Sequence, residues 1–141
     1  MKFTTSWDDG YALDMKVAAM LNANGAKGTF YLCPHEQHGK DMLSATDIKA
    51  LTKSHELGAH TINHSKLTLL PKGNVREEIV NSKKWIEEQS GTPCSMFCYP
   101  YGARNSEIET IVQEAGFTGA RGTQQMQFQS DNAFHQNTSL Q

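Results

Sequence analysis

Ser6-Trp7-Asp8-Asp9-Gly10 is the stretch around which the rest of the chain is organised. Two adjacent carboxylates follow a short β-like run that alternates from Lys2 to Trp7. Successive strand side chains point to opposite faces, so both carboxylates can serve one side only if the strand ends here. Gly10 supplies the backbone freedom for that turn. One carboxylate can then bind a cation while its neighbour handles protons, although Asp-Gly is also a common turn pair.

Composition excludes several classes of function. The chain has 141 residues and a formal charge of −2, which predicts one domain. Acidic and basic residues are interspersed, and no basic run indicates a nucleic-acid partner. No apolar stretch reaches the ~20 residues that a membrane span needs. Cys33, Cys94 and Cys98 are odd in number and lack paired metal-type spacing, so we expect reduced thiols.

The first residues bear on localisation. Met1-Lys2-Phe3 leads straight into the first expected strand and leaves no room for a leader peptide. The cytoplasm is therefore the default expectation. A secreted or cell-envelope location would require that a leader has already been removed.

Expected strands and helices alternate along the chain. Strands are expected at 2–7, 28–33, 57–60, 96–99 and 117–121. Helices are expected with an apolar face of Leu13, Val17, Met20 and Leu21; after a capping box at Ser44–Asp47; from a cap at Asn74 to about Gln89; and from Ser106 to Ala115. Such alternation with short connections predicts parallel βα units. A full eight-stranded barrel takes ~250 residues, so the fold class is α/β, a distorted or incomplete (β/α) barrel with mainly parallel strands.

The chain divides by pattern at residue 122. Residues 1–122 form the expected domain. In residues 123–141 the apolar periodicity stops, and six of these nineteen residues are glutamine. With little apolar surface to hold it, this polar tail is expected to be loosely attached, or to be an incomplete end of the same domain.

Three polar motifs follow three of the expected strands. Asp8-Asp9 follows the first, His60-x-x-x-His64 the third and Tyr99-Pro100-Tyr101-Gly102 the fourth. In parallel βα architectures ligands bind at the carboxyl ends of the strands, so the motifs share one rim. A lone histidine pair is more often an ordinary polar pair. Two histidines with an aspartate on the same rim instead predict a metal site, and three ligands leave zinc an open position for water.

Together the motifs resemble a known family. Ser6–Gly10, His60–His64 and Phe97–Gly102 are similar, in order and spacing, to the first three motifs of the polysaccharide deacetylases, carbohydrate esterase family 4. The resemblance covers residues 2–122. It implies a hydrolase that removes N- or O-linked acetyl groups from a carbohydrate of the N-acetylglucosamine type.

The resemblance also implies roles for individual residues. Asp9, His60 and His64 would hold a divalent metal ion, with zinc expected and cobalt, nickel and manganese as alternatives. Asp8 would be the general base, because a metal-bound carboxylate keeps little basicity. The backbone N–H of Tyr101 would donate to the developing oxyanion.

The chain departs from the family pattern at two points. Many members carry an arginine just before the Pro-Tyr-Gly element, where this chain has Cys98, and Arg121 is the expected substitute partner for Asp8. The family's late Leu-x-His motif, which supplies a general acid, has no clean match. His135 is the only histidine in the tail and is expected to be a chance surface residue.

Two alternative functions stay open at this point. The same fold could hydrolyse a small amide or imide. The chain could instead be a non-catalytic carbohydrate-binding or interaction domain, which Cys98 and the missing acid would favour.

Overall fold

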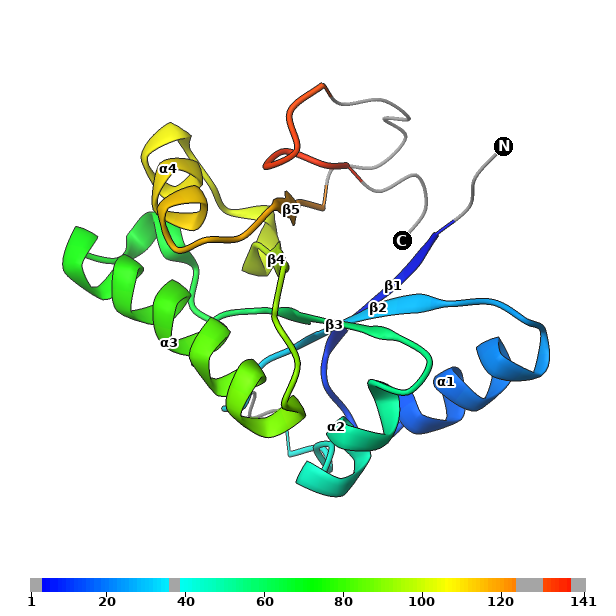
Figure 1. Cartoon of the computed structure of the whole chain (residues 1–141). Coiled ribbons are helices and arrows are strands. Elements are labelled where there is room, and N and C mark those ends of the chain that lie inside the picture. Colours follow the sequence, from blue (N-terminus) through cyan, green and yellow to red (C-terminus); the bar gives the residue numbers. More distant parts are fainter. Residues whose placement is uncertain (1–3, 36–38, 124–130, 138–141) are drawn as a thin grey trace.

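Five parallel strands form the centre of the molecule. The computed structural model describes residues 4–35, 39–123 and 131–137. The strands lie side by side in chain order (Figure 1): β1 Thr5–Asp9, β2 Gly28–Leu32, β3 Glu56–Ala59, β4 Met96–Cys98 and β5 Gly119–Arg121. Every neighbouring pair is parallel. The sheet curls into a half-barrel, which confirms the expected incomplete (β/α) barrel.

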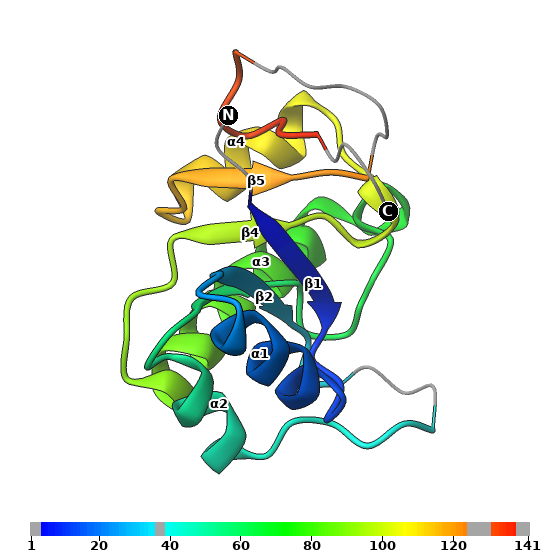
Figure 2. The same ribbon diagram turned by 90° about the vertical axis from the view of Figure 1, so that its right-hand side faces the viewer.

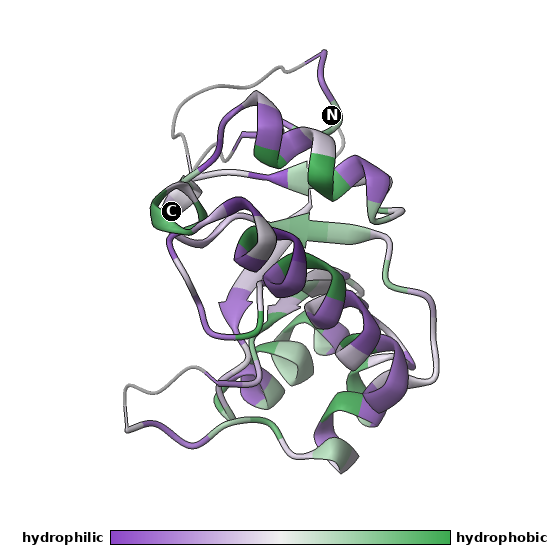
Figure 3. Cartoon of the chain, turned by 90° about the vertical axis from the view of Figure 1, so that its left-hand side faces the viewer, coloured by the Kyte–Doolittle hydropathy of each residue, from purple (hydrophilic) through white to green (hydrophobic). Residues whose placement is uncertain are grey.

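Helices connect the strands and cover the core. They are α1 Asp14–Ala23, α2 Ala45–Leu51, α3 Lys72–Ser90 and α4 Ser106–Glu114, with short 3₁₀ turns η1 Leu67–Leu69 and η2 Pro100–Gly102. The core joins Phe30 and Phe97 of the strands to Ile79, Ile86 and Val112 of the helices, all fully buried. Figure 3 shows hydrophilic and hydrophobic residues alternating along the helices that flank the sheet. An amphipathic pattern of this kind favours packing of the apolar side of a helix against the core.

The ends of the helices follow the sequence closely, with one exception. Ser44 caps α2, and the capping box with Asp47 is present as predicted. Gly91 follows α3 in the left-handed conformation, and the helix ends at Ser90, one residue beyond the predicted Gln89. The predicted cap at Asn74 is wrong, because α3 begins two residues earlier at Lys72, after Pro71. Proline fixes the backbone angle that leads into a helix, and here it starts the helix without a side-chain cap.

The predicted apolar face of α1 is partly wrong. Leu13 is 61% exposed and Met20 is 68% exposed. Asp14 and Ala18 are the buried residues of this helix. Apolar residues occur on several sides of α1, so the sequence pattern alone did not select the face that packs against the sheet. The packing instead carries a carboxylate, Asp14, into the interior.

The first strand runs further than predicted. It includes Asp8 and Asp9, whereas the sequence placed its end at Trp7. The turn needed to redirect the two carboxylates occurs at Asp9 itself, where φ is +80°, and continues at Gly10 with φ of +81°. The left-handed backbone of Asp9 interrupts the alternation of side chains along the strand. Asp9 is therefore both paired with β2 and the first residue of the turn.

Part of the tail lies against the sheet. The Ala120 N–H donates to the carbonyl of Ala133, and the Gln136 N–H donates to that of Ala120. The Gly122 N–H donates to the carbonyl of Gln136. In Figure 1 and Figure 2 this segment lies above β5. Residues 131–137 are thus attached by backbone pairing, contrary to the predicted loose attachment, while 124–130 and 138–141 lie outside the described residues.

Composition also gave expectations about the cysteines and about membrane-spanning segments. All three cysteines are free and buried, as expected for reduced thiols. Within the described ranges, no helix is long and apolar enough to cross a membrane.

Candidate metal centre

Backbone strain is concentrated in the three motifs. Among the described residues, four non-glycine residues have positive φ: Asp9 at +80°, Thr61 at +64°, His64 at +51° and Tyr101 at +57°. Such conformations cost on the order of 1–3 kcal/mol each, and they persist where the surroundings over-determine them. All four lie at the carboxyl rim of the sheet, which makes that rim the candidate functional site.

Three potential ligands converge at the rim. Asp9 Oδ1 lies 3.3 Å from His64 Nε2 and 3.7 Å from His60 Nε2. The ligand atoms of the three residues lie within 4.8 Å of one another. In a tetrahedral zinc site with bonds of 2.0–2.1 Å, neighbouring ligand atoms are about 3.3 Å apart. The distances from Asp9 to the two imidazoles are close to that spacing, so the donor set suits a divalent cation.

Hydrogen bonds aim His60 at Asp9. Its Nδ1 lies 2.8 Å from the Cys98 carbonyl oxygen, which can only accept, so Nδ1 donates and Nε2 carries the lone pair. Burial lowers the pKa of His60, against the opposing charge of Asp8, and this keeps the imidazole neutral as a metal ligand must be.

His64 is oriented from the other side. Its Nδ1 lies 3.1 Å from the Tyr101 hydroxyl, and the two rings meet edge to face. A hydroxyl can donate or accept, so this contact suits either tautomer of His64. The hydrogen bond from His64 lowers the pKa of Asp9, against the opposing effect of partial burial. Asp9 is thus ionised, as a carboxylate ligand must be.

Asp8 is held apart from the three ligands. Arg121, which is buried, forms an ion pair with Asp8 Oδ1. The guanidinium also lies over the ring of Tyr31, with its Cζ atom 5.1 Å from the ring centroid. This contact fixes the rotamer of Asp8 and leaves Oδ2 outside the ion pair. The position that the sequence suggested for Arg121 is therefore the one observed.

The thiol of Cys98 occupies the space beside Asp8. Its Sγ lies 3.8 Å from Asp8 Oδ2, and Asp8, His60 and Cys98 form a second compact group of potential ligands. Burial, followed by the charge of Asp8, raises the pKa of Cys98 well above its ordinary value. The thiol keeps its proton and Asp8 is paired with Arg121, so Asp9, His60 and His64 form the better cation site.

All six predicted site residues meet at one rim, but two neighbouring carboxylates were not predicted. Glu78 on α3 binds the loop that carries the two histidines. Asp14 is buried at the start of α1. The signal for Glu78 was present in the sequence, since it follows Val75 by three residues and so shares the inner face of α3.

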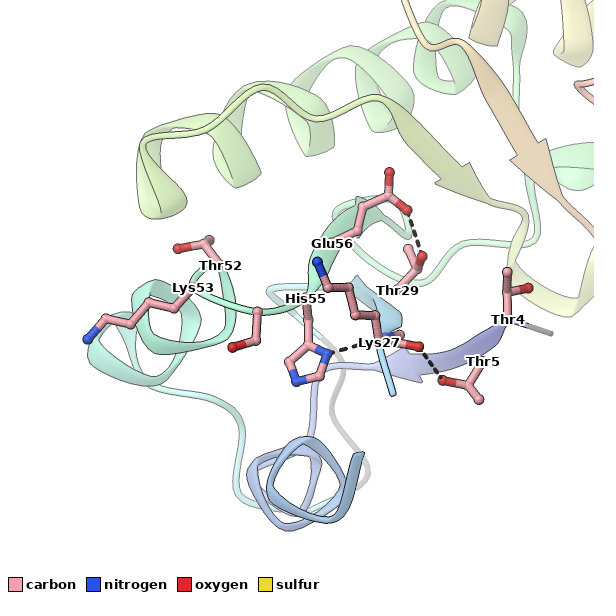
Figure 4. Close-up of a pocket in the computed structure, with 10 residues that line it drawn as sticks. Thr4, Thr5, Lys27, Thr29, Thr52, Lys53, His55 and Glu56 are labelled. Atoms are coloured by element: carbon pink, nitrogen blue, oxygen red, sulfur yellow. Dashed lines mark hydrogen bonds between the residues drawn. The ribbon is translucent and has the colours of Figure 1, made fainter. Parts of the chain in front are cut away.

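A surface pocket lies at the opposite end of the sheet. It measures about 390 Å³ and is lined by the first residues of three strands, Thr5, Gly28 and Glu56. Figure 4 shows the Thr29 hydroxyl bonded to Glu56 and His55 bonded to the backbone beside Lys27. The lining of this pocket contains none of the six predicted site residues. In (β/α) barrels this amino-terminal side serves stability rather than catalysis.

Comparisons with known proteins agree on the fold. The deacetylase PplD of Streptococcus pyogenes, solved in complex with acetate, superposes with a TM-score of 0.85 at 18% identity, over 94% of this chain and 61% of that chain. The polysaccharide deacetylase BC0361 of Bacillus cereus superposes with a TM-score of 0.82 at 22% identity, over 94% of this chain and 45% of that chain. The uncharacterized protein YlxY of Bacillus subtilis (strain 168) is 25% identical over 109 residues, which is 77% of this chain and 33% of that protein.

These shares of length limit what the similar proteins imply. The chain spans a third of the curated relative and about half to three-fifths of these two solved structures. At such identities the solved structures establish the half-barrel fold and nothing further. Sequence evidence for ancestry comes from the family model named polysaccharide deacetylase, which matches residues 2–120 and so includes all three metal-centre motifs. The chain therefore belongs to the polysaccharide deacetylase family.

Proposed function

We propose that this protein is a metal-dependent hydrolase that removes N- or O-linked acetyl groups from a carbohydrate of the N-acetylglucosamine type. The observation that carries the proposal is the separation of roles at the rim. Asp9, His60 and His64 converge on one point, while Asp8 is held beside them by Arg121. Family membership supports the same activity.

The residues of the chain divide the chemistry between them. A divalent cation held by Asp9, His60 and His64, with zinc expected, would polarise the acetyl carbonyl and make the attacking water more acidic. Asp8 would accept the proton of that water at Oδ2, because Oδ1 is engaged by Arg121. The backbone N–H of Tyr101 would donate to the oxyanion. The left-handed conformation of Tyr101 is fixed by the turn at Pro100–Gly102, so this donor would be preorganised.

The leaving group also needs a proton. Among the described residues, the hydrogen-bond and ion-pair partners of Asp8 are Arg121 and Cys98, and neither is a general acid of ordinary strength. After accepting the first proton, Asp8 would be the group that returns it to the leaving nitrogen or oxygen. One carboxylate would then act first as base and afterwards as acid.

The metal site is tested by metal content. We expect the purified protein to bind one zinc ion per chain. The His60→Ala variant should lose it, because the two ligands that remain, Asp9 and His64, are too few to retain the ion. His135→Ala, which removes a histidine outside the cluster, is the matched control and should keep the full metal content. Equal zinc in wild type and His60→Ala would refute the site.

The base is tested by separating metal binding from turnover. We expect Asp8→Asn to keep its metal but to lose ~10²- to 10⁴-fold in acetate release from chitooligosaccharides, the usual contribution of a general base. Asp41→Asn makes the same isosteric change at an exposed site and should be fully active. Loss of metal from Asp8→Asn would mean that the roles of Asp8 and Asp9 are reversed.

A substrate panel decides between the open functions. Acetate released from N-acetylated oligosaccharides supports the proposal. Turnover confined to a small amide or imide would favour the alternative hydrolase. Glycan binding with bound metal and no turnover of any substrate would favour a binding domain.

A further inference from the structure

The loop that joins the two metal-binding histidines, residues 61–63, is strained and tightly enclosed. Thr61 and His64 have left-handed backbones, and Thr61 is fully buried. The carbonyl of Ile62 accepts from the backbone N–H of His35 and from the thiol of Cys33. The strand side of the loop is therefore held by the end of β2. Its opposite side needs a partner that can accept from the remaining N–H groups.

Glu78 is that partner. Its Oε2 accepts from the backbone N–H of Ile62 at 2.9 Å and from that of Asn63 at 3.0 Å. Its Oε1 accepts from the side-chain amide of Asn63. The oxygen of the same amide, Oδ1, lies 3.0 Å from His35 Nδ1, so the contact continues to the end of β2. One carboxylate thus binds three donors of a loop three residues long.

The burial of Glu78 is unusual for a carboxylate. It is 9% exposed and lies on the inner face of α3 beside Val75 and Ile79. In the described part of the chain no arginine, lysine or histidine forms an ion pair with it. A buried charge without a countercharge is costly unless several hydrogen bonds compensate it. The loop donors supply those bonds, so the carboxylate and the loop conformation depend on each other.

We propose that Glu78 is a positioning residue for the metal centre, which holds the strained loop so that His60 and His64 face Asp9 before metal binds. The inference rests on the proposed metal-binding function. Preorganisation lowers the free-energy cost of ordering the ligands on binding, and partners behind the ligands typically change metal affinity by about 10- to 100-fold. Glu78 acts through the backbone of the loop and touches none of the reacting atoms.

Glu78→Gln tests the carboxylate with minimal change of shape. Glutamine has one acceptor oxygen, so its NH₂ group would face a donor unless Asn63 turns its amide and changes its contact with His35. We expect the dissociation constant for zinc, measured by competition with a chromophoric chelator, to rise about 10- to 100-fold. The visible absorption spectrum of the cobalt-loaded variant should also change, because the two imidazoles are less well fixed.

Two controls separate positioning from general stability. Glu77→Gln makes the same change on the exposed side of α3 and should leave zinc affinity within twofold of wild type. Ile86→Val removes one methylene from the same buried face further along α3, and it should lower stability without changing zinc affinity. Unchanged affinity in folded Glu78→Gln, or an equal loss in Ile86→Val, would overturn the proposal.

Two further measurements serve if Glu78→Gln does not fold. Amide hydrogen exchange in metal-free wild type should show strong protection at Ile62 and Asn63, and exchange there at the rate of an open loop would overturn the proposal. Asn63→Ala keeps the carboxylate and removes one donor, so zinc affinity should fall by a smaller factor in the same direction. Unchanged affinity in Asn63→Ala would count against the proposal.

These readouts are independent of acetate release. Zinc binding by wild type without deacetylation of any glycan would refute the proposed function, while the role of Glu78 would still be decided by the affinities. A wild-type protein that binds no zinc would overturn both.

Discussion

At the scale of single residues, Asp14 is a buried carboxylate in an unfavourable environment. It is 6% exposed, and its Oδ2 finds no hydrogen-bond partner among the described residues. Burial, followed by the charges of Asp9 and Asp8, raises the pKa of Asp14 from its ordinary 3.8 to about 7. An acid whose pKa is higher in the folded state binds its proton more tightly there. Stability therefore falls as pH rises between about 4 and about 7.

We expect Asp14→Asn to stabilise the metal-free protein at alkaline pH. The neutral amide removes the cost of the buried charge. The gain in the free energy of unfolding should therefore appear above pH 4 and reach its full value by about pH 7. At ~1.4 kcal/mol per pKa unit, the upper bound is about 4 kcal/mol. Urea unfolding at pH 4 and pH 8 in the presence of a chelator measures it, with Asp41→Asn as the exposed control. A variant no more stable than wild type at pH 8 would contradict this reading of Asp14.

Other residues show where sequence reasoning succeeded. The positions of Asp8, Asp9, His60, His64, Tyr101 and Arg121 at one rim followed from motif order, because parallel strands place their carboxyl ends together. Asp14 and Glu78 could not be predicted to the same degree. Their importance comes from burial beside the site, and burial is set by packing between segments that are distant in the sequence.

At the scale of secondary-structure elements, local signals predicted most helix ends. The capping box of α2 and the glycine stop of α3 depend on residues next to one another, and both are present. The inward face of α1 depends instead on tertiary packing, and the pattern predicted it only in part. The start of α3 depends on a similar competition between two helix-start signals three residues apart, Pro71 and Asn74. The helix follows Pro71.

Elements also explain how the site tolerates its strain. Asp9 is the last residue of β1, and the other three strained residues, Thr61, His64 and Tyr101, follow the ends of β3 and β4. The preceding strand residues are fixed by parallel pairing. The sheet and the helices behind it hold the rim in unfavourable backbone conformations. A site built in this way has its ligands placed before a cation or a substrate arrives.

At the scale of the whole molecule, residues 131–137 are joined to the half-barrel at the β5 edge. Beyond the backbone pairing with β5, the Tyr99 hydroxyl donates to the carbonyl of Phe134. The ring of Phe134 is partly buried against the core. His135 contacts Arg104 and Glu109, behind the turn that carries Tyr101. Residues 131–137 therefore pack beside the turn that carries Tyr101, and His135 is engaged by Arg104 and Glu109.

The last prediction follows from that arrangement. His135→Ala should change turnover by less than ~10-fold and leave metal content unchanged, because a histidine held by Arg104 and Glu109 is not placed to protonate a leaving group. Phe134→Ala should lower the free energy of unfolding by about 1–3 kcal/mol, the value of burying part of an aromatic side chain. Acetate release and urea unfolding on both variants separate the two effects. A hundredfold loss of turnover in His135→Ala, with metal retained and stability unchanged, would instead show that the tail supplies the missing acid.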